Sequence, residues 1–161
     1  MPVRTAIRDR LEAQGFYELD DEALDELAPW MRWTYTLGLV VTMIGVALTS
    51  PAVLWSLAAI TAVGIFLPFH PFDLLYNFGF RYVTGTRPFP KSGPQRHFVF
   101  ALATVWLAAT GWAFHIGSTV GGVALGVPLI LVAAVASTTN FCIPSFIYNT
   151  IVRPKERKTD G

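Results

Sequence analysis

The side chains best suited to chemistry in this sequence are one cysteine and two histidines, which stand where apolar stretches meet charged segments. Cys142 is the only cysteine, and His70 and His97 are two of the three histidines. Thiolate and imidazole bind borderline metals such as zinc, but metal sites of that kind use several ligands at regular spacing. We therefore take Cys142, His70 and His97 as a candidate thiol and interfacial site, and predict no catalytic, cofactor-binding or metal residues. A metal site formed by these three residues is the alternative.

The chemistry open to Cys142 is limited because the chain has no second cysteine. A lone cysteine cannot form an intrachain disulfide, which excludes a self-contained dithiol exchange mechanism. A mixed disulfide, a persulfide or an acyl anchor formed with an external partner stays open. These reactions need the thiolate, which apolar burial disfavours. The sequence favours a buried, inert thiol over a reactive one.

The helices expected to position these residues come from long stretches without charged side chains. The chain of 161 residues is 53% hydrophobic and 14% charged, with a mean hydropathy of +0.47, which is too apolar for an ordinary soluble domain. Residues 33–72 and 97–152 contain no Asp, Glu, Lys or Arg, and a helix needs about 20 apolar residues to cross a membrane. The sequence predicts an all-α membrane protein with four transmembrane helices in two tandem hairpins, near residues 33–49, 52–69, 98–115 and 120–138.

The basic residues indicate an orientation for these helices. All twelve Lys and Arg residues precede the first predicted span, separate the second from the third, or follow the fourth, and the two hairpin turns carry none. The positive-inside rule then places both termini and the middle loop in the cytoplasm, with the helices in the bacterial inner membrane. Residues 1–30 lack the apolar core of a cleavable signal peptide, so the first span is expected to serve as the insertion signal.

The chain divides by composition into three parts: an acidic N-terminal segment (1–30), a transmembrane domain (31–152) and a basic cytoplasmic tail (153–161). Asp20 is placed to cap a short helix in the first part. Two interpretations of the acidic segment are open. It is either a solvated helix or a helix that docks on a basic protein surface, since anionic lipid would repel its carboxylates.

An internal repeat relates the two predicted hairpins. Residues 69–77 align with residues 141–149, and the matched units are about 33–83 and 98–153. Each unit is expected to be a hairpin followed by an interfacial amphipathic helix. Convergence on a common interfacial composition is the other interpretation. On each such helix, polar residues at i, i+4 and i+8 form one stripe: Asp73, Asn77 and Arg81 in the first copy, and Ser145, Asn149 and Arg153 in the second.

Two glycines in the fourth predicted span are expected to allow close helix packing. Gly122 and Gly126 form a small-xxx-small pair, which lets two helix backbones approach closely in a membrane. The expected partners of the chain are therefore membrane lipids and a larger membrane protein complex, and no nucleic acid.

Three short motifs carry a resemblance to a known family. They comprise Pro71, Phe72, Leu75 and Tyr76, then Pro94, Arg96 and Phe98, and finally Phe141, Cys142 and Tyr148. Over about residues 33–150 the chain resembles an uncharacterised bacterial four-span membrane family of unknown function that ends in Phe-Cys-x-x-Cys-x-x-Tyr. Ser145 stands in place of the second cysteine. A paired-thiol redox role, which the family motif implies, is therefore not expected of this chain.

Together these features lead us to expect a non-enzymatic accessory or assembly subunit of a larger membrane complex, such as one of respiratory or photosynthetic electron transfer. The first alternative is a single-cysteine thiol or sulfur-handling membrane protein that acts with an external redox partner. A small-molecule carrier is a further alternative, although the predicted spans offer few polar residues at mid-membrane.

Overall fold

The computed structural model describes residues 2–14, 16, 20–139 and 142–152. Within these ranges every regular element is a helix. The elements are α1 (Pro2–Ala13), α2 (Asp21–Leu27), α3 (Trp33–Ala47), α4 (Pro51–Phe66), α5 (Pro71–Leu75), the π-helical turn η1 (Tyr76–Phe80), α6 (Arg81–Thr84), α7 (Pro94–His115), α8 (Thr119–Thr139) and α9 (Ile143–Val152).

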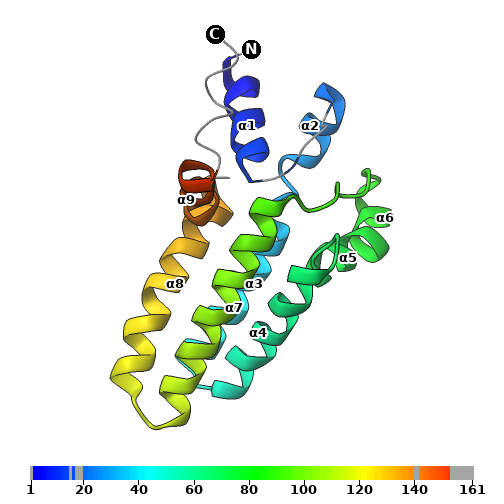
Figure 1. Ribbon diagram of the computed structural model, residues 1–161. Coiled ribbons are helices and arrows are strands. Elements are labelled where there is room, and N and C mark those ends of the chain that lie inside the picture. The colour runs from blue at the N-terminus through cyan, green and yellow to red at the C-terminus, as the bar shows by residue number, and fades with distance from the viewer. Residues whose placement is uncertain (1, 15, 17–19, 140–141, 153–161) are drawn as a thin grey trace.

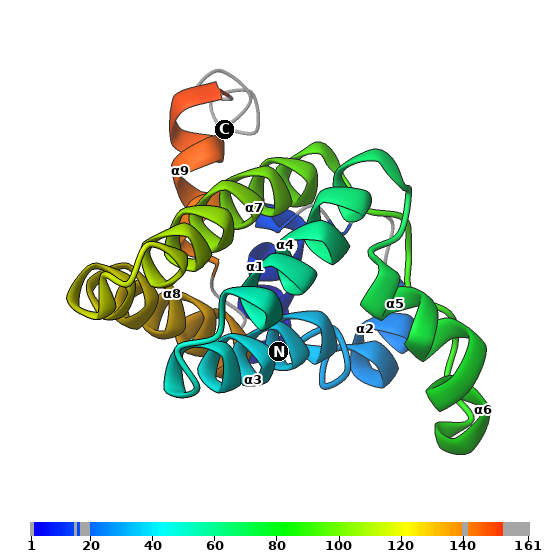
Figure 2. The ribbon, with the colours of Figure 1, turned by 90° about the horizontal axis from the view of Figure 1, so that it is seen from below.

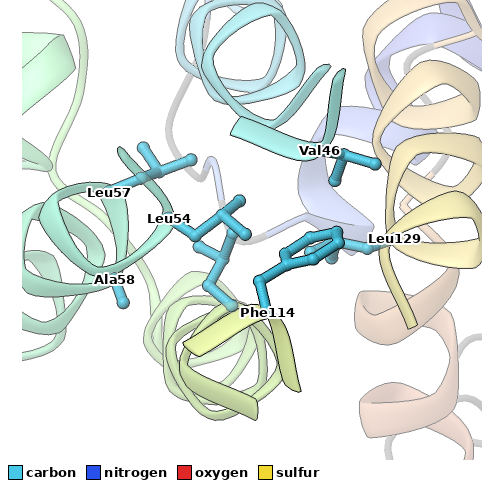
Figure 3. Close-up of a cluster of buried hydrophobic side chains, with 7 residues drawn as sticks. Val46, Leu54, Leu57, Ala58, Phe114 and Leu129 are labelled. Carbon is cyan, nitrogen blue, oxygen red and sulfur yellow. The ribbon is translucent and has the colours of Figure 1, made fainter. Parts of the chain in front are cut away.

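The four longest helices, α3, α4, α7 and α8, lie side by side, and each packs against two of the others (Figures 1 and 2). Their core is a cluster of aliphatic and aromatic side chains contributed by all four helices. Figure 3 shows Val46 of α3, Leu54 of α4, Phe114 of α7 and Leu129 of α8 pointing toward one another. Turns connect α3 to α4 and α7 to α8 at one end of the molecule, and the remaining helices gather at the other end (Figure 1).

These helices begin where the sequence provides helix-start signals. Pro51 and Pro94 stand in the first turns of α4 and α7, where a missing amide hydrogen is harmless and the fixed φ angle suits a helix. The side chain of Ser50 accepts a hydrogen bond from the backbone amide of Val53 and so caps α4. The four helices coincide closely with the four stretches predicted from the absence of charge.

Two of the helices, α7 and α8, are long and apolar enough to cross a membrane. A third candidate exists if α4 and the helical segment 71–84 count as one span, with a bend of 85° between them. Helix α3 is apolar but has only 15 residues. By length and composition the described part of the chain therefore contains two to three candidate spans, against the four expected.

The bend after α4 is encoded by proline. His70 precedes Pro71 and is extended, with φ −67° and ψ 147°, as expected for a residue whose helical conformation is blocked by the following proline ring. The side chain of His70 and the carboxylate of Asp73 then form a reciprocal cap on α5. Gly85 ends α6 in the left-handed conformation, with φ 69°, which costs glycine little.

The N-terminal helices pack against this corner of the molecule. Leu11, Phe16 and Leu27 form a second buried cluster with Tyr76 and Phe89. The segment predicted to be a separate acidic unit thus shares a core with the rest of the chain.

Arginines from the same region contact the end of α8. The guanidinium of Arg10 donates to the carbonyl of Thr139 at 3.1 Å, and that of Arg32 donates to the carbonyl of Thr138 at 3.0 Å. Cations at a helix C-terminus satisfy its free carbonyls and complement its dipole. These contacts fix the N-terminal helices to the end of the long helices.

Candidate functional site

A fully buried ion pair lies where α3, α5 and α7 meet. Atom Nη1 of Arg96 lies 2.9 Å from Oδ2 of Asp73, and Nη2 lies 3.3 Å from Oδ1. The guanidinium therefore binds the carboxylate through two nitrogens. The two side chains are 0% and 1% exposed. Bidentate geometry is the strongest arrangement for such a pair. The pair joins the start of α7 to the corner that follows α4.

Further groups contact both members of this pair. The hydroxyl of Thr34 on α3 and the backbone amide of His70 both donate to the Asp73 carboxylate. Arg96 also donates to the hydroxyl of Ser92 at 3.1 Å, and its guanidinium lies 4.5 Å from the ring centre of Phe16. Removing one partner from a buried pair leaves an uncompensated charge, which typically costs about 3–5 kcal/mol. The pair is therefore expected to hold this end of the molecule together.

The imidazole of His70 is held in one orientation. Its Nδ1 accepts a hydrogen bond from the amide of Phe72 at 3.2 Å, which leaves the proton of the neutral ring on Nε2. The ring lies 4.4 Å from the ring centre of Phe100. On the other side it is so close to α4 that a Cβ atom added to Gly64 would lie 2.5 Å from its Cδ2 atom. Nε2 is buried and has no hydrogen-bond partner in the described part of the chain.

A cavity of about 110 Å³ lies between the four long helices and reaches this polar end. Its walls are mainly apolar and include Leu57, Leu107 and Leu129. Its polar lining comprises Thr34, Tyr35, His70 and Cys142, together with Thr42, Thr61 and Trp106 further along. Cavities of this kind, apolar with a few polar groups, are the usual form of small-molecule sites in proteins.

The polar groups along the cavity wall differ from those at its end. Thr42 and Thr61 donate to carbonyls within their own helices, and the indole of Trp106 donates to the carbonyl of Leu125 at 2.9 Å. Nε2 of His70 is buried and makes no hydrogen bond to any described residue, whereas the buried hydroxyl of Tyr35 interacts with the Arg96 guanidinium and the Cys142 thiol. Nε2 of His70 is therefore an unpartnered hydrogen-bonding atom on a residue of the described cavity lining.

Cys142 lies at the same polar end and is 4% exposed. Burial raises the pKa of its thiol, against the opposing effects of the nearby Ser145 hydroxyl and the Arg96 guanidinium. A raised pKa keeps the thiol protonated at neutral pH and lowers its nucleophilicity. The geometry agrees with a thiol that is unreactive while this end of the molecule stays closed.

The candidate thiol and interfacial residues are only partly brought together. His70 and Cys142 both line the cavity, whereas His97 lies outside its lining and donates from Nδ1 to the carbonyl of Ile65 at 2.6 Å. Among the described residues, no group of three or more His, Cys, Asp or Glu side chains is placed to hold a metal ion.

The residues of the first polar stripe lie in different environments. Asp73 and Asn77 are buried, and the amide side chain of Asn77 accepts a hydrogen bond from the backbone amide of Phe89 at 2.8 Å. Arg81 is half-buried beside Tyr82. The turn η1 adds a residue to the helical repeat between Asn77 and Arg81, so the expected i, i+4, i+8 register is interrupted.

The second stripe is described only in part, because Arg153 lies outside the described residues. The hydroxyl of Ser145 is buried beside the thiol of Cys142. Asn149 donates to the carbonyl of Ala13 at 2.8 Å and accepts from the side chain of Gln95 at 3.3 Å. These contacts tie α9 to α1 and α7.

The two glycines of α8 lie at close helix contacts. A Cβ at Gly122 would overlap the ring of Phe114 on α7, and one at Gly126 would lie 2.6 Å from Val46 on α3. Glycine at these positions lets α8 approach both neighbours.

An exposed cluster around Arg87 accounts for part of the acidic N-terminal segment. The guanidinium of Arg87 lies 3.2 Å from Asp20, 2.8 Å from Glu22 and 3.5 Å from Glu26. The pKa of Asp20 is lowered by a hydrogen bond from the amide of Ala23 and by the charge of Arg87, and the carboxylates, Glu22 first, raise the pKa of Arg87. The basic surface that this segment contacts thus belongs to the same chain.

Two residues of the buried site, Arg96 and Tyr35, are not among the candidate site residues predicted from the sequence. Arg96 enters the sequence analysis only through a family motif and as one of the basic residues between the second and third predicted spans. The Gly93-Pro94 pair is a helix-start signal and would have placed Arg96 within the first turn of α7, where a charge inside an apolar helix needs a partner. No comparable sequence signal identifies Tyr35.

Comparison with known proteins places this region within a family. The model of a domain of unknown function, DUF4395, matches residues 28–153. The match covers the ion pair, the cavity and Cys142. No curated protein and no solved structure gives a significant match to the chain.

Proposed function

The chain belongs to the DUF4395 family, and we propose that it is a four-span membrane protein that serves as a non-enzymatic accessory or assembly subunit of a larger membrane complex. The partner we propose is a complex such as one of respiratory or photosynthetic electron transfer. The proposal has three parts: the number of spans, the orientation of the chain, and a lateral contact made by α8.

The packing of the two shorter helices along the two longer ones supports four spans. Helix α4 packs along α7, and α3 packs along α8 (Figures 1 and 2). Their outward side chains are apolar; Val40, Met43 and Val63 are between 46% and 50% exposed. If α7 and α8 cross the hydrocarbon, then α3 and α4 lie at the same depth. An outward apolar face suits lipid as the surrounding solvent.

The orientation is supported by the charges of the described residues. Arg10, Arg32, Arg87 and Lys91 lie on segments that flank the long helices at the end where α1 and α9 meet. The turns at the opposite end carry no charged residue. By the positive-inside rule, the end with α1 and α9 faces the cytoplasm of a bacterial cell.

The observation that carries the accessory role is the outward face of α8. In the most apolar 18-residue stretch of α8, 22% is buried within the chain, compared with 39% in the corresponding stretch of α7. Ala124 and Pro128 are both exposed on it. Pro128 has no amide hydrogen and cannot donate to the carbonyl of Ala124, which lies four residues before it. In hydrocarbon such a carbonyl is satisfied by a neighbouring helix, a Ser or Thr side chain, an ordered water or a local change of helix geometry. We propose that a helix of the partner complex packs here.

A matched pair of variants tests this contact. Ala124→Trp places a bulky ring on the outward face of α8, and Ala59→Trp places the same ring at an exposed position of α4. After gentle solubilisation from the native membrane, native electrophoresis with mass spectrometry should show the wild type and Ala59→Trp comigrating with the same larger complex. Ala124→Trp should run without it. Migration of the wild type only as an isolated chain would contradict the proposal.

A thiol-handling role is the second candidate, because Cys142 lines the cavity beside His70 and Tyr35. In this role the Cys142 thiolate attacks a disulfide of an external partner, forming a mixed disulfide and releasing the partner's second sulfur as a thiolate. The test is labelling by a small maleimide in intact and permeabilised membranes, with Cys142→Ser as the control. A thiol that stays unlabelled under every native condition would remove this candidate.

A further inference from the structure

We infer that two short segments of this chain, α5–η1–α6 and α9, are lateral arms that lie in the cytoplasmic leaflet of the membrane and present an apolar surface to lipid. The inference rests on the four-span architecture proposed above. It goes beyond that architecture because it assigns the surface of these two segments, and it does not depend on the partner complex proposed for α8.

The first arm, α5–η1–α6, buries its polar side chains and exposes its apolar ones. Asp73 and Asn77 are buried against the rest of the chain, whereas Leu75, Phe78 and Val83 are exposed, Phe78 to 76% and Val83 to 86%. A helix on a water-facing surface has the reverse arrangement, with its polar residues outward. Large exposed apolar surface of this kind marks a contact with a membrane or with another protein.

The direction of the first arm favours lipid over a helix of another protein. Segment 71–84 is bent by 85° from α4, so it runs nearly parallel to the membrane plane when α4 crosses the bilayer. A helix in that plane contacts lipid along its whole length, whereas a transmembrane helix of a partner would cross it at one place only. The exposed apolar surface also continues onto α4 at Val63 and Phe66.

The last turn of the first arm carries residues that suit the depth of the lipid headgroups. The guanidinium of Arg81 donates to the hydroxyl of Tyr82 at 3.2 Å and lies 4.8 Å from the centre of its ring. Tyr82 is exposed and Arg81 is half-buried. Both side chains have an apolar body and a polar end, and such residues collect where acyl chains meet headgroups. The pair therefore fits a segment that lies at this boundary.

The second arm, α9, repeats this arrangement in the other half of the chain. Ser145 is buried, while Phe146, Ile147 and Ile151 are exposed. Figure 2 shows α9 and α6 projecting from opposite sides of the four long helices, and Figure 1 shows both toward the end of the molecule where α1 lies. In the proposed orientation the two arms therefore lie in the same, cytoplasmic leaflet.

The experiment uses the purified full chain in lipid nanodiscs at one chain per disc, with a nitroxide label on a single cysteine in a Cys142→Ser background. Phe78→Cys and Ile151→Cys report on the two arms. Val105→Cys, exposed on α7, is the lipid-facing reference, and Lys91→Cys is the water-facing one. Collision of the label with oxygen, which concentrates in hydrocarbon, is compared with its collision with a water-soluble nickel chelate. The ratio of oxygen to chelate collisions should be several times higher on both arms than for Lys91→Cys, and close to that of Val105→Cys.

Three results would overturn the inference, and each has a different meaning. If the arm labels collide with the chelate as often as Lys91→Cys while Val105→Cys does not, the arms lie in water and the spans still stand. Low collision rates with both reagents would show that protein covers the arms, as in a self-association of the chain. Free access of the chelate to Val105→Cys would overturn the proposed spans, and the inference with them.

Discussion

Two arginines of this chain pair with carboxylates in opposite surroundings. Arg96 and Asp73 are 0% and 1% exposed, whereas Arg87 and Asp20 are 43% and 66% exposed. Water and salt screen the exposed pair, and such pairs contribute little to stability. The buried pair is unscreened, and losing one partner strands a charge in an apolar environment. The buried ion pair therefore holds one end of the core together, whereas the exposed ion pair only orders the surface.

The largest expected effect comes from separating the buried pair. Asp73→Asn keeps the shape of the side chain but leaves the Arg96 guanidinium without a counter-charge, so we expect a loss of about 3–5 kcal/mol in the free energy of unfolding. Unfolding by sodium dodecyl sulfate in mixed micelles measures this loss. The double variant Asp73→Asn/Arg96→Met should recover part of it, because no buried charge remains. A double variant less stable than either single variant would contradict this account.

A smaller loss is expected when a neighbour of the pair is displaced. Gly64→Ala would place a Cβ atom 2.5 Å from Cδ2 of His70, which must move the imidazole and, with it, the backbone amide that binds Asp73. Overpacking of this kind typically costs about 1–3 kcal/mol. In the same unfolding assay Gly79→Ala is the control, since a Cβ there meets nothing within 4 Å. Equal stability of the two variants would show that the ring is not held as described.

The exposed cluster should respond far less. Arg87→Ala removes the cation shared by Asp20, Glu22 and Glu26, yet the unfolding transition should move by much less than in Asp73→Asn. Raising the salt concentration should reduce the remaining difference from the wild type, because exposed charges are screened. A loss as large as that of Asp73→Asn would mean that the two pairs do not differ as proposed.

The smallest effect concerns the pH dependence of the N-terminal helix α2. Because the folded state lowers the pKa of Asp20, the resulting stabilisation is fully present above the ordinary carboxyl pKa and is lost as the pH falls through the lowered value. Hydrogen exchange of the Ala23 amide, which donates to Asp20, should therefore lose protection only below the ordinary carboxyl pKa, after correction for intrinsic rates. Asp20→Asn keeps an acceptor that does not titrate, so its protection should not show this loss.

The sequence was sufficient to place the long helices and insufficient to pair their polar groups. Charge-free stretches were enough to place α3, α4, α7 and α8, because this signal is local. The ion pair joins residues 23 positions apart across a bend, and the hydroxyl of Thr34 comes from a third helix. Which groups meet depends on how the helices pack. The sequence predicts Asp73 in a polar stripe and Cys142 in a candidate thiol and interfacial site, but their common surroundings appear only in three dimensions.

The most direct test of the proposed architecture is the sidedness of three single cysteines introduced into a Cys142→Ser background. Thr49→Cys and Ile116→Cys lie in or beside the two turns at one end, and Lys91→Cys lies in the segment between α6 and α7; all three positions are exposed. A membrane-impermeant maleimide applied to cells with a permeabilised outer envelope and an intact inner membrane should label the first two and reach the third only after the inner membrane is opened. Labelling of Lys91→Cys from outside, or opposite sidedness of Thr49→Cys and Ile116→Cys, would contradict four spans with both ends in the cytoplasm.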